Sequence, residues 1–523
     1  MIRRRSLLLL LLILALFGAG TAWLAQVRPI DGDEGYYATA ARLTASGQTP
    51  YADYFYPQMP YLPYLYGPLQ GVVGPSLTGL RLGSVAALVL TLGLWGALLV
   101  ARVGDRPMFV VGGLLLLALN PHLLSWGVTT KTFALANLGV VGALWAADRG
   151  LATRKLVWFL VSGLAAALAV GVRLLYAPWA VALLGGLAWL RWRRPATGIT
   201  PASVAAAGVG LLLGLVPALR LYLADPERFV FNNLIYHRLR FNPLDRLVAE
   251  GEAPDVPRFL AALLELARAL LLNPSLLVLI GLAVVGVRAA RRPGAHDHSD
   301  TELRPVALLA GWGAVVLALT CLLPDPSYEQ YFTAPLVPLL VPAALLGLID
   351  LARRFGRPTT LVGGVLGALA VIAAVGLQVR HVGMDWNEVW DPARVREVAR
   401  EIRQRSARDD VVLSFWSGYP FAADRPFLPG MENHFALGVS EQLTPAQQAH
   451  YHVAGKEALL HAILTKGPAV IVLGTWMHEV NTTIAQEHLP VLLQELDANY
   501  RIDWYRGEVK VLVRKPGPGA KLR

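Results

Sequence analysis

The sequence predicts an all-α polytopic membrane domain followed by a small α/β domain. Of the 523 residues, 55% are hydrophobic and only 16% are charged, well below the roughly one quarter that is usual in soluble domains. The mean hydropathy is +0.48. Apolar runs of about 18 or more residues, long enough to cross the hydrocarbon core of a bilayer as helices, recur along residues 1–380. These observations exclude an ordinary soluble enzyme.

We predict about eleven membrane spans from these runs. The first span follows Arg3–Arg5. We interpret it as an uncleaved signal anchor, because its apolar core is too long for a signal peptide and further spans follow it. The expected spans are 6–26, 79–101, 107–125, 132–148, 156–172, 174–190, 203–223, 274–290, 305–323, 332–352 and 359–379.

Basic clusters at every second junction between the spans predict the orientation of the chain, because Lys and Arg accumulate on the cytoplasmic side. They account for much of the net charge of +11, so that charge does not indicate a nucleic-acid partner. We expect the bacterial inner membrane, with the N-terminus in the cytoplasm and the C-terminus outside it. The clusters are Arg3–Arg5, Arg102/Arg106, Arg149/Arg154/Lys155, Arg191/Arg193/Arg194, Arg288/Arg291/Arg292 and Arg353/Arg354/Arg357.

Three polar stretches are expected on the extracytoplasmic side. Two are loops of the membrane domain 1–380, at 27–78 and 225–258, and the third is a water-soluble domain over 381–523. The third stretch alternates helical patterns with short apolar runs, which is typical of an α/β domain. The expected helices are 392–407, 455–465 and 486–498, and the expected strands are Val411–Trp416, Ala469–Gly474 and Val509–Val513. The single cysteine, Cys321, excludes a disulfide within the chain.

Three carboxylates, Asp31, Asp33 and Glu34, lie within four residues after the first span. A helical pattern begins at Glu34, so Asp33 could cap a helix on the membrane surface. A cap needs one Asp, however, and does not need Asp31 and Glu34 as well. The alternative is a general base, or a divalent-metal site at Asp33 and Glu34, facing a membrane-embedded cleft. No other cofactor is indicated.

The text around these carboxylates resembles a known family. The pattern Asp-Glu-x-x-Tyr at 33–37, Ala-Arg-Leu-x-x-x-Gly at 41–47 and the Tyr/Pro-rich stretch 50–60 resemble bacterial protein-mannosyltransferase-like glycosyltransferases. That superfamily, the GT-C fold, includes the lipid A aminoarabinose transferase, and the resemblance extends to 328–338. It implies a polyprenyl-phosphate sugar donor used on the extracytoplasmic side with inversion at the anomeric carbon. It also implies that Asp33 is the catalytic carboxylate.

One position departs from the aminoarabinose branch. Where that branch carries a Glu-Lys pair before a proline, this chain has Gln58 and Met59. The acid that helps to hold a metal and the lysine that meets phosphate are both replaced. We therefore do not expect an aminoarabinose donor, and other cations must bind the donor phosphate.

Candidate cations lie at outward junctions, where the orientation predicts none. Arg173 has the planar fork that suits phosphate, and the alternative is a structural pair with a loop carboxylate. Lys131 either binds the donor or extends along the interface. In the second loop His237, Arg238 and Arg240 either bind the donor or are solvated. The expected substrate cleft contains Tyr36, Tyr56, Gln58, Tyr328 and Tyr331, although the last two also fit an aromatic belt.

The aromatic segment Phe415–Phe421 joins a predicted strand to a polar loop. Aromatic faces bind sugars by stacking, so this segment either faces the acceptor or ends an ordinary core strand.

These features predict an integral membrane glycosyltransferase that moves a hexosyl or pentosyl group from a lipid phosphate to a hydroxyl of a protein, lipid or glycan. The alternative is a flippase or transporter for a polyprenyl-linked lipid. Transporters usually carry ionisable residues near the midplane in matched halves. Here the spans have apolar centres and the polar residues gather at the outer rim, which favours the enzyme.

Overall fold

A computed structural model describes residues 2–239, 258–271, 273–291, 298–323, 329–356, 358–382, 390–465, 467–474 and 489–516. The chain divides into two compact units, each described by itself below. Unit 1 contains Met1–Ala25, Leu82–Leu219 and Val256–Gly383, and unit 2 contains Gln26–Arg81, Arg220–Asp255 and Met384–Arg523. Unit 2 contains segments from both sides of residue 380, the predicted boundary between the membrane domain and the water-soluble domain. That boundary stays a prediction.

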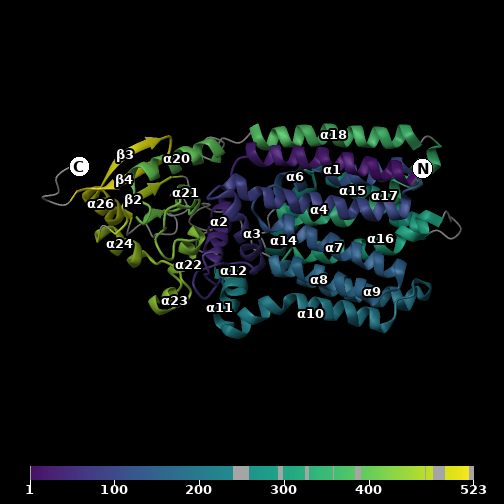
Figure 1. The fold of residues 1–523 in the computed structure, drawn as a ribbon, viewed down its shortest axis with the longest axis horizontal. Helices are drawn as coiled ribbons and strands as arrows, with labels where there is room; N and C mark the ends of the chain where they lie inside the picture. Colours follow the sequence, from purple (N-terminus) through teal and green to yellow (C-terminus); the bar gives the residue numbers. More distant parts are fainter. Residues whose placement is uncertain are drawn as a thin grey trace. The chain divides into compact units, whose positions relative to one another are not determined.

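The described residues of unit 1 are mostly helical, and the axes of its long helices lie roughly alongside one another in Figure 1. Several continue by a few residues into unit 2. The helices are α1 (Ile2–Val27), α4 (Leu77–Val103), α5 (Pro107–Ala118), α6 (Pro121–Gly127), α7 (Thr132–Thr153), α8 (Leu156–Val172), α9 (Ala177–Arg193), α10 (Pro201–Ala224), α14 (Arg258–Leu271), α15 (Pro274–Arg291), α16 (His298–Thr320), α17 (Glu329–Phe355) and α18 (Pro358–Val382), with short 3-10 turns η1 (Leu174–Tyr176) and η2 (Pro195–Thr197).

The chain is a multi-pass membrane protein. Among the described residues, seven helices are long and apolar enough to cross a membrane, or eight if the bent pair α5 and α6 forms one span. Two further apolar helices, Leu156–Val172 and Pro274–Ala290, are shorter. The expected number of eleven spans is therefore not confirmed.

The expected span 107–125 is bent by 58° between α5 and α6. The first helix ends at Ala118, and Asn120 caps the second, since its Oδ1 accepts a hydrogen bond from the amide of Leu123 at 3.0 Å. Pro121 then occupies the first position of α6, where a missing N–H costs little. Hydropathy alone does not distinguish such a break from a straight helix.

Helix α17 is almost entirely buried in unit 1, and α15 packs closely on it. A Cβ at Gly286 would collide with the carbonyl oxygen of Ala343, and one at Gly347 would collide with that of Leu282. Glycines at such contacts let membrane helices approach backbone to backbone, where van der Waals packing drives association.

Unit 2 combines the two polar loops with the C-terminal segment. From the loops come α2 (Gly32–Ala45), α3 (Tyr61–Val73), α11 (Pro226–Val230), the π-helical turn η3 (Phe231–Ile235) and α12 (Tyr236–Leu239). From the C-terminal segment come α20 (Pro392–Arg405), β1 (Val412–Ser414), α21 (Gly418–Ala423), η4 (His434–Ala436), α22 (Leu437–Ser440), α23 (Pro445–His450), α24 (Lys456–Leu464), β2 (Val470–Leu473), α26 (Leu489–Asn499), β3 (Tyr500–Arg506) and β4 (Val509–Arg514).

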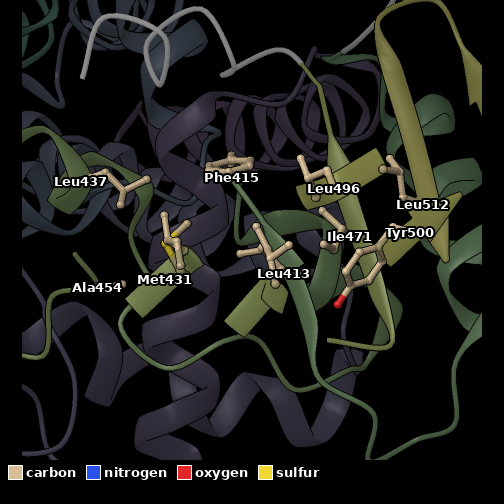
Figure 2. Close-up of a cluster of buried hydrophobic side chains, with 11 residues drawn as sticks. Leu413, Phe415, Met431, Leu437, Ala454, Ile471, Leu496, Tyr500 and Leu512 are labelled. Atoms are coloured by element: carbon tan, nitrogen blue, oxygen red, sulfur yellow. The ribbon is translucent and has the colours of Figure 1, made fainter. Parts of the chain in front are cut away.

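The sheet has the order β1-β2-β4-β3. Strands β1 and β2 are parallel, with Leu413 opposite Ile471, and β4 runs antiparallel to both β2 and β3. Figure 2 shows the apolar core of this domain, in which both of these residues lie with Phe415, Leu496 and Leu512. The predicted α/β character of the C-terminal segment is confirmed. Strand β3 was not predicted, because five of its seven residues are exposed and give no apolar run.

Candidate active site

The first loop of unit 2 begins helix α2 with a capping box. The side chain of Asp31 accepts a hydrogen bond from the amide of Asp33 at 3.0 Å, and Glu34 Oε1 accepts one from the amide of Asp31 at 2.8 Å. The cap is therefore Asp31. The interpretation that Asp33 caps the helix, and that a cap would need only one acid, was wrong, because a capping box uses two acids reciprocally.

Arg81, at the start of α4, binds the other side of Glu34. Both side chains are fully buried. Arg81 donates from Nε to Glu34 Oε2 at 2.7 Å and from Nη2 to Glu34 Oε1 at 2.6 Å. It also donates to the carbonyl oxygens of Arg28 and Pro29, each at 2.8 Å. This bidentate, charge-assisted pair fixes the path of the chain into α2.

Arg81 was not among the candidate residues predicted from the sequence, although its position gives a signal. It lies near the outward end of the second expected span, where positive-inside orientation predicts no cation. The same signal singled out Arg173.

Asp33 occupies the second position of α2 and is half-buried. Its side chain belongs to neither half of the capping box, since Asp31 and Glu34 supply both acceptors. Burial raises the pKa of the neighbouring Tyr36 well above its ordinary value, and the charges of Tyr37 and Asp33 add to the rise. Asp33 is thus a carboxylate held on a rigid helix end beside a protonated phenol.

Aromatic rings of unit 2 pack together near the start of helix α2. The ring of Tyr36 lies 4.2 Å from that of Tyr37 and 6.5 Å from that of Tyr56. The amide of Tyr56 donates to Asn232 Oδ1 at 2.9 Å, which joins the two loops. Half-buried Gln58 follows two residues later. Tyr36 and Tyr56 therefore lie close together, and Gln58 lies on the same loop as Tyr56.

The second loop contacts the first loop through His237. A ring nitrogen of His237 lies 3.0 Å from the carbonyl oxygen of Pro57, which brings this histidine to the first loop. Arg238 is exposed. Arg240, predicted to bind the donor phosphate, and Tyr328, predicted to line the substrate cleft, lie outside the described residues.

In unit 1, Arg173 ends helix α8 in an extended conformation. Its guanidinium donates to Thr132 Oγ1 at 3.3 Å and lies 4.3 Å from the ring centre of Tyr331 and 5.0 Å from that of Phe133. Stacking between aromatic rings orients an arginine fork without neutralising it. The half-buried Arg173 is thus brought together with Tyr331, one of the predicted cleft residues.

Lys131 is buried, and its ammonium lies 5.0 Å from the ring centre of Trp126. Nearby in the chain, His122 Nδ1 lies 2.6 Å from Glu329 Oε1. His122 and Lys131 both follow the bend between α5 and α6, and Glu329 is the first residue of α17.

The proposed metal ligands do not form a metal site. In the described ranges, no group of three or more His, Cys, Asp or Glu side chains could hold a metal ion. Both carboxylate oxygens of Glu34 already accept hydrogen bonds from Arg81. The residues present therefore do not fit a divalent cation, and the reaction proposed below does not use one.

The aromatic segment of the C-terminal domain does not present its rings to an acceptor. Phe415, Trp416, Tyr419 and Phe421 are each at most 3% exposed. Phe415 belongs to the core in Figure 2. The alternative reading, an ordinary strand end in the core, is therefore correct for Phe415.

Glu432 gives a prediction about pH. Burial raises its pKa from 4.5 to about 7, although backbone amides of Gly430 and of Glu432 itself lower it. The folded protein then binds this proton more tightly than the unfolded chain, so the free energy of unfolding falls as pH rises from about 4.5 to 7. Glu432→Gln, which stays neutral, is expected to remove this fall. Unfolding midpoints of both proteins at pH 5 and pH 8 measure it, and identical pH dependence would contradict the assignment.

No protein-family model matches the chain, and no curated protein matches it. Solved structures do match. ArnT from Cupriavidus metallidurans bound to undecaprenyl phosphate is 16% identical, with a TM-score of 0.66 over 97% of each chain. The apo structure of the same ArnT is also 16% identical, with a TM-score of 0.64 over 96% of this chain and 97% of ArnT.

The archaeal oligosaccharyltransferase AglB from Archaeoglobus fulgidus, in complex with an inhibitory peptide and a dolichol-phosphate, is also similar. It is 12% identical, with a TM-score of 0.50 over 92% of this chain and 72% of AglB. These likenesses show the fold. The GT-C-like fold expected from the first-loop motif is confirmed.

Proposed function

We propose that this chain is an integral membrane glycosyltransferase that moves a sugar from a polyprenyl-phosphate donor to an acceptor hydroxyl, with Asp33 as general base. The observation that carries the proposal is the position of Asp33, on a helix end whose capping and ion pairing are supplied by Asp31, Glu34 and Arg81. The likeness to ArnT bound to undecaprenyl phosphate, and to AglB in complex with a dolichol-phosphate, supports a lipid-phosphate donor.

In the proposed step, the acceptor oxygen attacks the anomeric carbon while its proton passes to the carboxylate of Asp33. The bond between the anomeric carbon and the phosphate oxygen breaks, and the lipid phosphate leaves with the electron pair. Attack opposite the leaving group inverts the anomeric carbon. We include Tyr36, Tyr56 and Gln58 in the substrate cleft as neighbours of the base.

The leaving phosphate requires fixed positive charge. We assign this role first to Arg173, and then to Lys131, His237, Arg238 and Arg240. Tyr331 supports the guanidinium of Arg173 by stacking on it. We also assign Tyr328 to the substrate cleft, as its sequence motif predicts.

Arg173→Lys is expected to raise the KM for the donor by about ten-fold or more and to leave folding intact, because a point ammonium cannot form two parallel hydrogen bonds to phosphate. Donor-dependent kinetics of the purified variant measure it. Arg149→Lys is the matched control, since the guanidinium of Arg149 also lies over an aromatic ring, that of Trp145 at 5.9 Å, but at a junction expected in the cytoplasm. An unchanged donor KM in Arg173→Lys would return this arginine to a structural role.

We propose that the N-terminus is cytoplasmic and that unit 2, with the reaction, is extracytoplasmic. In a Cys321→Ala background, Arg408→Cys should react with a membrane-impermeant maleimide in intact cells, whereas Lys155→Cys should react only after lysis. Both positions are exposed. The reverse pattern would contradict the orientation.

The donor class is tested with the purified protein in nanodiscs and synthetic polyprenyl phosphates that carry mannose, glucose, arabinofuranose or aminoarabinose. We expect free polyprenyl phosphate, detected by mass spectrometry, from at least one of the first three donors when an envelope extract supplies the acceptor. Release from the aminoarabinose donor alone would contradict the inference drawn from Gln58 and Met59. No release from any of the four would contradict the proposed donor class.

A further inference from the structure

The C-terminal segment contacts the backbone on which Asp33 stands. The indole Nε1 of Trp416 donates a hydrogen bond of 2.8 Å to the carbonyl oxygen of Gly32, the residue before Asp33. Trp416 is 1% exposed, so this bond is shielded from water. A residue almost 400 positions further along the chain therefore binds the first turn of α2.

The approach is close enough to require glycine in α2. A Cβ at Gly35 would lie 2.5 Å from Trp416 Nε1 and 2.7 Å from the amide nitrogen of Gly418. Both distances are shorter than real side chains allow, so any other residue would push α2 away from the indole. The glycine is needed here for space, since a helix gains nothing else from it.

Trp416 is itself held in a fixed orientation. Its ring packs edge to face on Trp390, with ring centres 4.9 Å apart, and on Tyr419 at 4.7 Å. Strand β1 ends two residues before it, and Ser414 Oγ donates to the carbonyl oxygen of Trp416 at 2.8 Å. The C-terminal sheet thus presents a rigid N–H donor to the first loop.

The same segment also holds the far end of α2. Arg42 donates from Nη2 to the carbonyl oxygen of Arg425 at 3.0 Å and lies 4.0 Å from Asp424 Oδ1. Its guanidinium lies 5.5 Å from the ring centre of Phe421 and 5.4 Å from that of Phe427. With Trp416 at one end and Arg42 at the other, residues 416–427 bracket the helix that carries Asp33.

We propose that Trp416 is a positioning residue for Asp33, through which the C-terminal domain sets the orientation of the general base. This inference rests on the proposed function of Asp33. A base must be held to within about half an ångström of its productive geometry. Without the indole N–H, the peptide of Gly32 loses its partner on that side and the first turn of α2 gains freedom.

Trp416→Phe keeps an aromatic ring in the packing but removes the N–H donor. We expect kcat to fall about ten- to a hundred-fold, the loss typical of a displaced catalytic group, with the donor KM unchanged. Amide hydrogen exchange should become faster at residues 32–36, while the unfolding midpoint stays near that of the wild type. Trp504→Phe in β3 is the matched control and should leave both kcat and exchange in α2 unchanged.

The double variant Asp33→Asn/Trp416→Phe separates positioning from general support. If Trp416 acts through Asp33, its substitution costs nothing further in the Asp33→Asn background, because the coupling is complete. Equal losses in both backgrounds would overturn the inference. Wild-type kcat and exchange in Trp416→Phe would also overturn it while leaving an inactive Asp33→Asn, and hence the proposed function, intact.

If Trp416→Phe fails to fold, Gly35→Ala tests the same contact from the other side. The added methyl group should displace the first turn of α2 from the indole, lower kcat and leave the donor KM unchanged. Wild-type kcat in Gly35→Ala would overturn the inference. A wild-type rate in Asp33→Asn would instead remove the proposed function on which it rests.

Discussion

Asp33→Asn is expected to lower the rate of sugar transfer by about a hundred- to ten-thousand-fold, the usual contribution of a general base. The amide keeps the size of the side chain but cannot accept the proton of the acceptor hydroxyl. Folding should be unaffected, because the capping box uses Asp31 and Glu34 and does not use Asp33. Transfer by the purified variant, compared at equal amounts of folded protein, measures the loss.

Asp31→Asn is the matched control for this substitution. It makes the same chemical change two residues earlier, and asparagine caps helices about as well as aspartate does. We expect a folded protein with a much smaller loss of rate. Equal losses in the two variants would mean that the local negative charge matters, and that Asp33 is not the individual base.

Arg81→Ala is expected to destabilise the protein by about 3–5 kcal/mol, because it leaves the buried carboxylate of Glu34 without its cation. Glu34 and Arg81 are both fully buried, so water cannot replace the lost partner. Chemical unfolding in mixed micelles, or the yield of folded protein where the variant is too unstable, measures the effect.

The double variant Arg81→Ala/Glu34→Ala should be less destabilised than the sum of the two single variants, since it leaves no unpaired charge. Lys456→Ala is the control. It removes an ion pair with Glu441 at 2.7 Å whose side chains are 26% and 41% exposed, and such pairs contribute about 0–1 kcal/mol. A loss in Arg81→Ala no larger than in this control would show that the buried pair does not hold the loop.

The apolar character of the membrane helices and three of the four strands, β1, β2 and β4, were predictable, because each depends on a local run of apolar residues. The contact of Trp416 with Gly32 and that of Arg42 with Arg425 were not predictable from the sequence. They join residues 384 and 383 positions apart, and no local pattern reports such a pairing. From the sequence, the aromatic segment after β1 could either face an acceptor or end an ordinary core strand, and the structure packs its rings in the core and against α2.

The region around Asp33 was predicted in composition but not in detail. The three acids were singled out correctly, yet their separate contacts depend on where α2 begins. A start at Gly32 makes Asp31 the cap and Glu34 its reciprocal partner, whereas a start two residues later would make Asp33 the cap and place Tyr36 at the reciprocal position. The other contact of Glu34 depends on Arg81, because a buried arginine is costly unless it is paired, and its guanidinium binds the carboxylate of Glu34.

The most direct test of the account is whether the protein breaks the bond between sugar and lipid phosphate. The purified chain is reconstituted in liposomes with a polyprenyl-phosphate donor labelled in the sugar, together with an acceptor extract. We predict that the label leaves the donor lipid and appears in glycosylated product, and that Asp33→Asn abolishes this transfer while still folding. Label that changes leaflets but stays on the polyprenyl lipid, equally in wild type and Asp33→Asn, would contradict the account and identify a flippase.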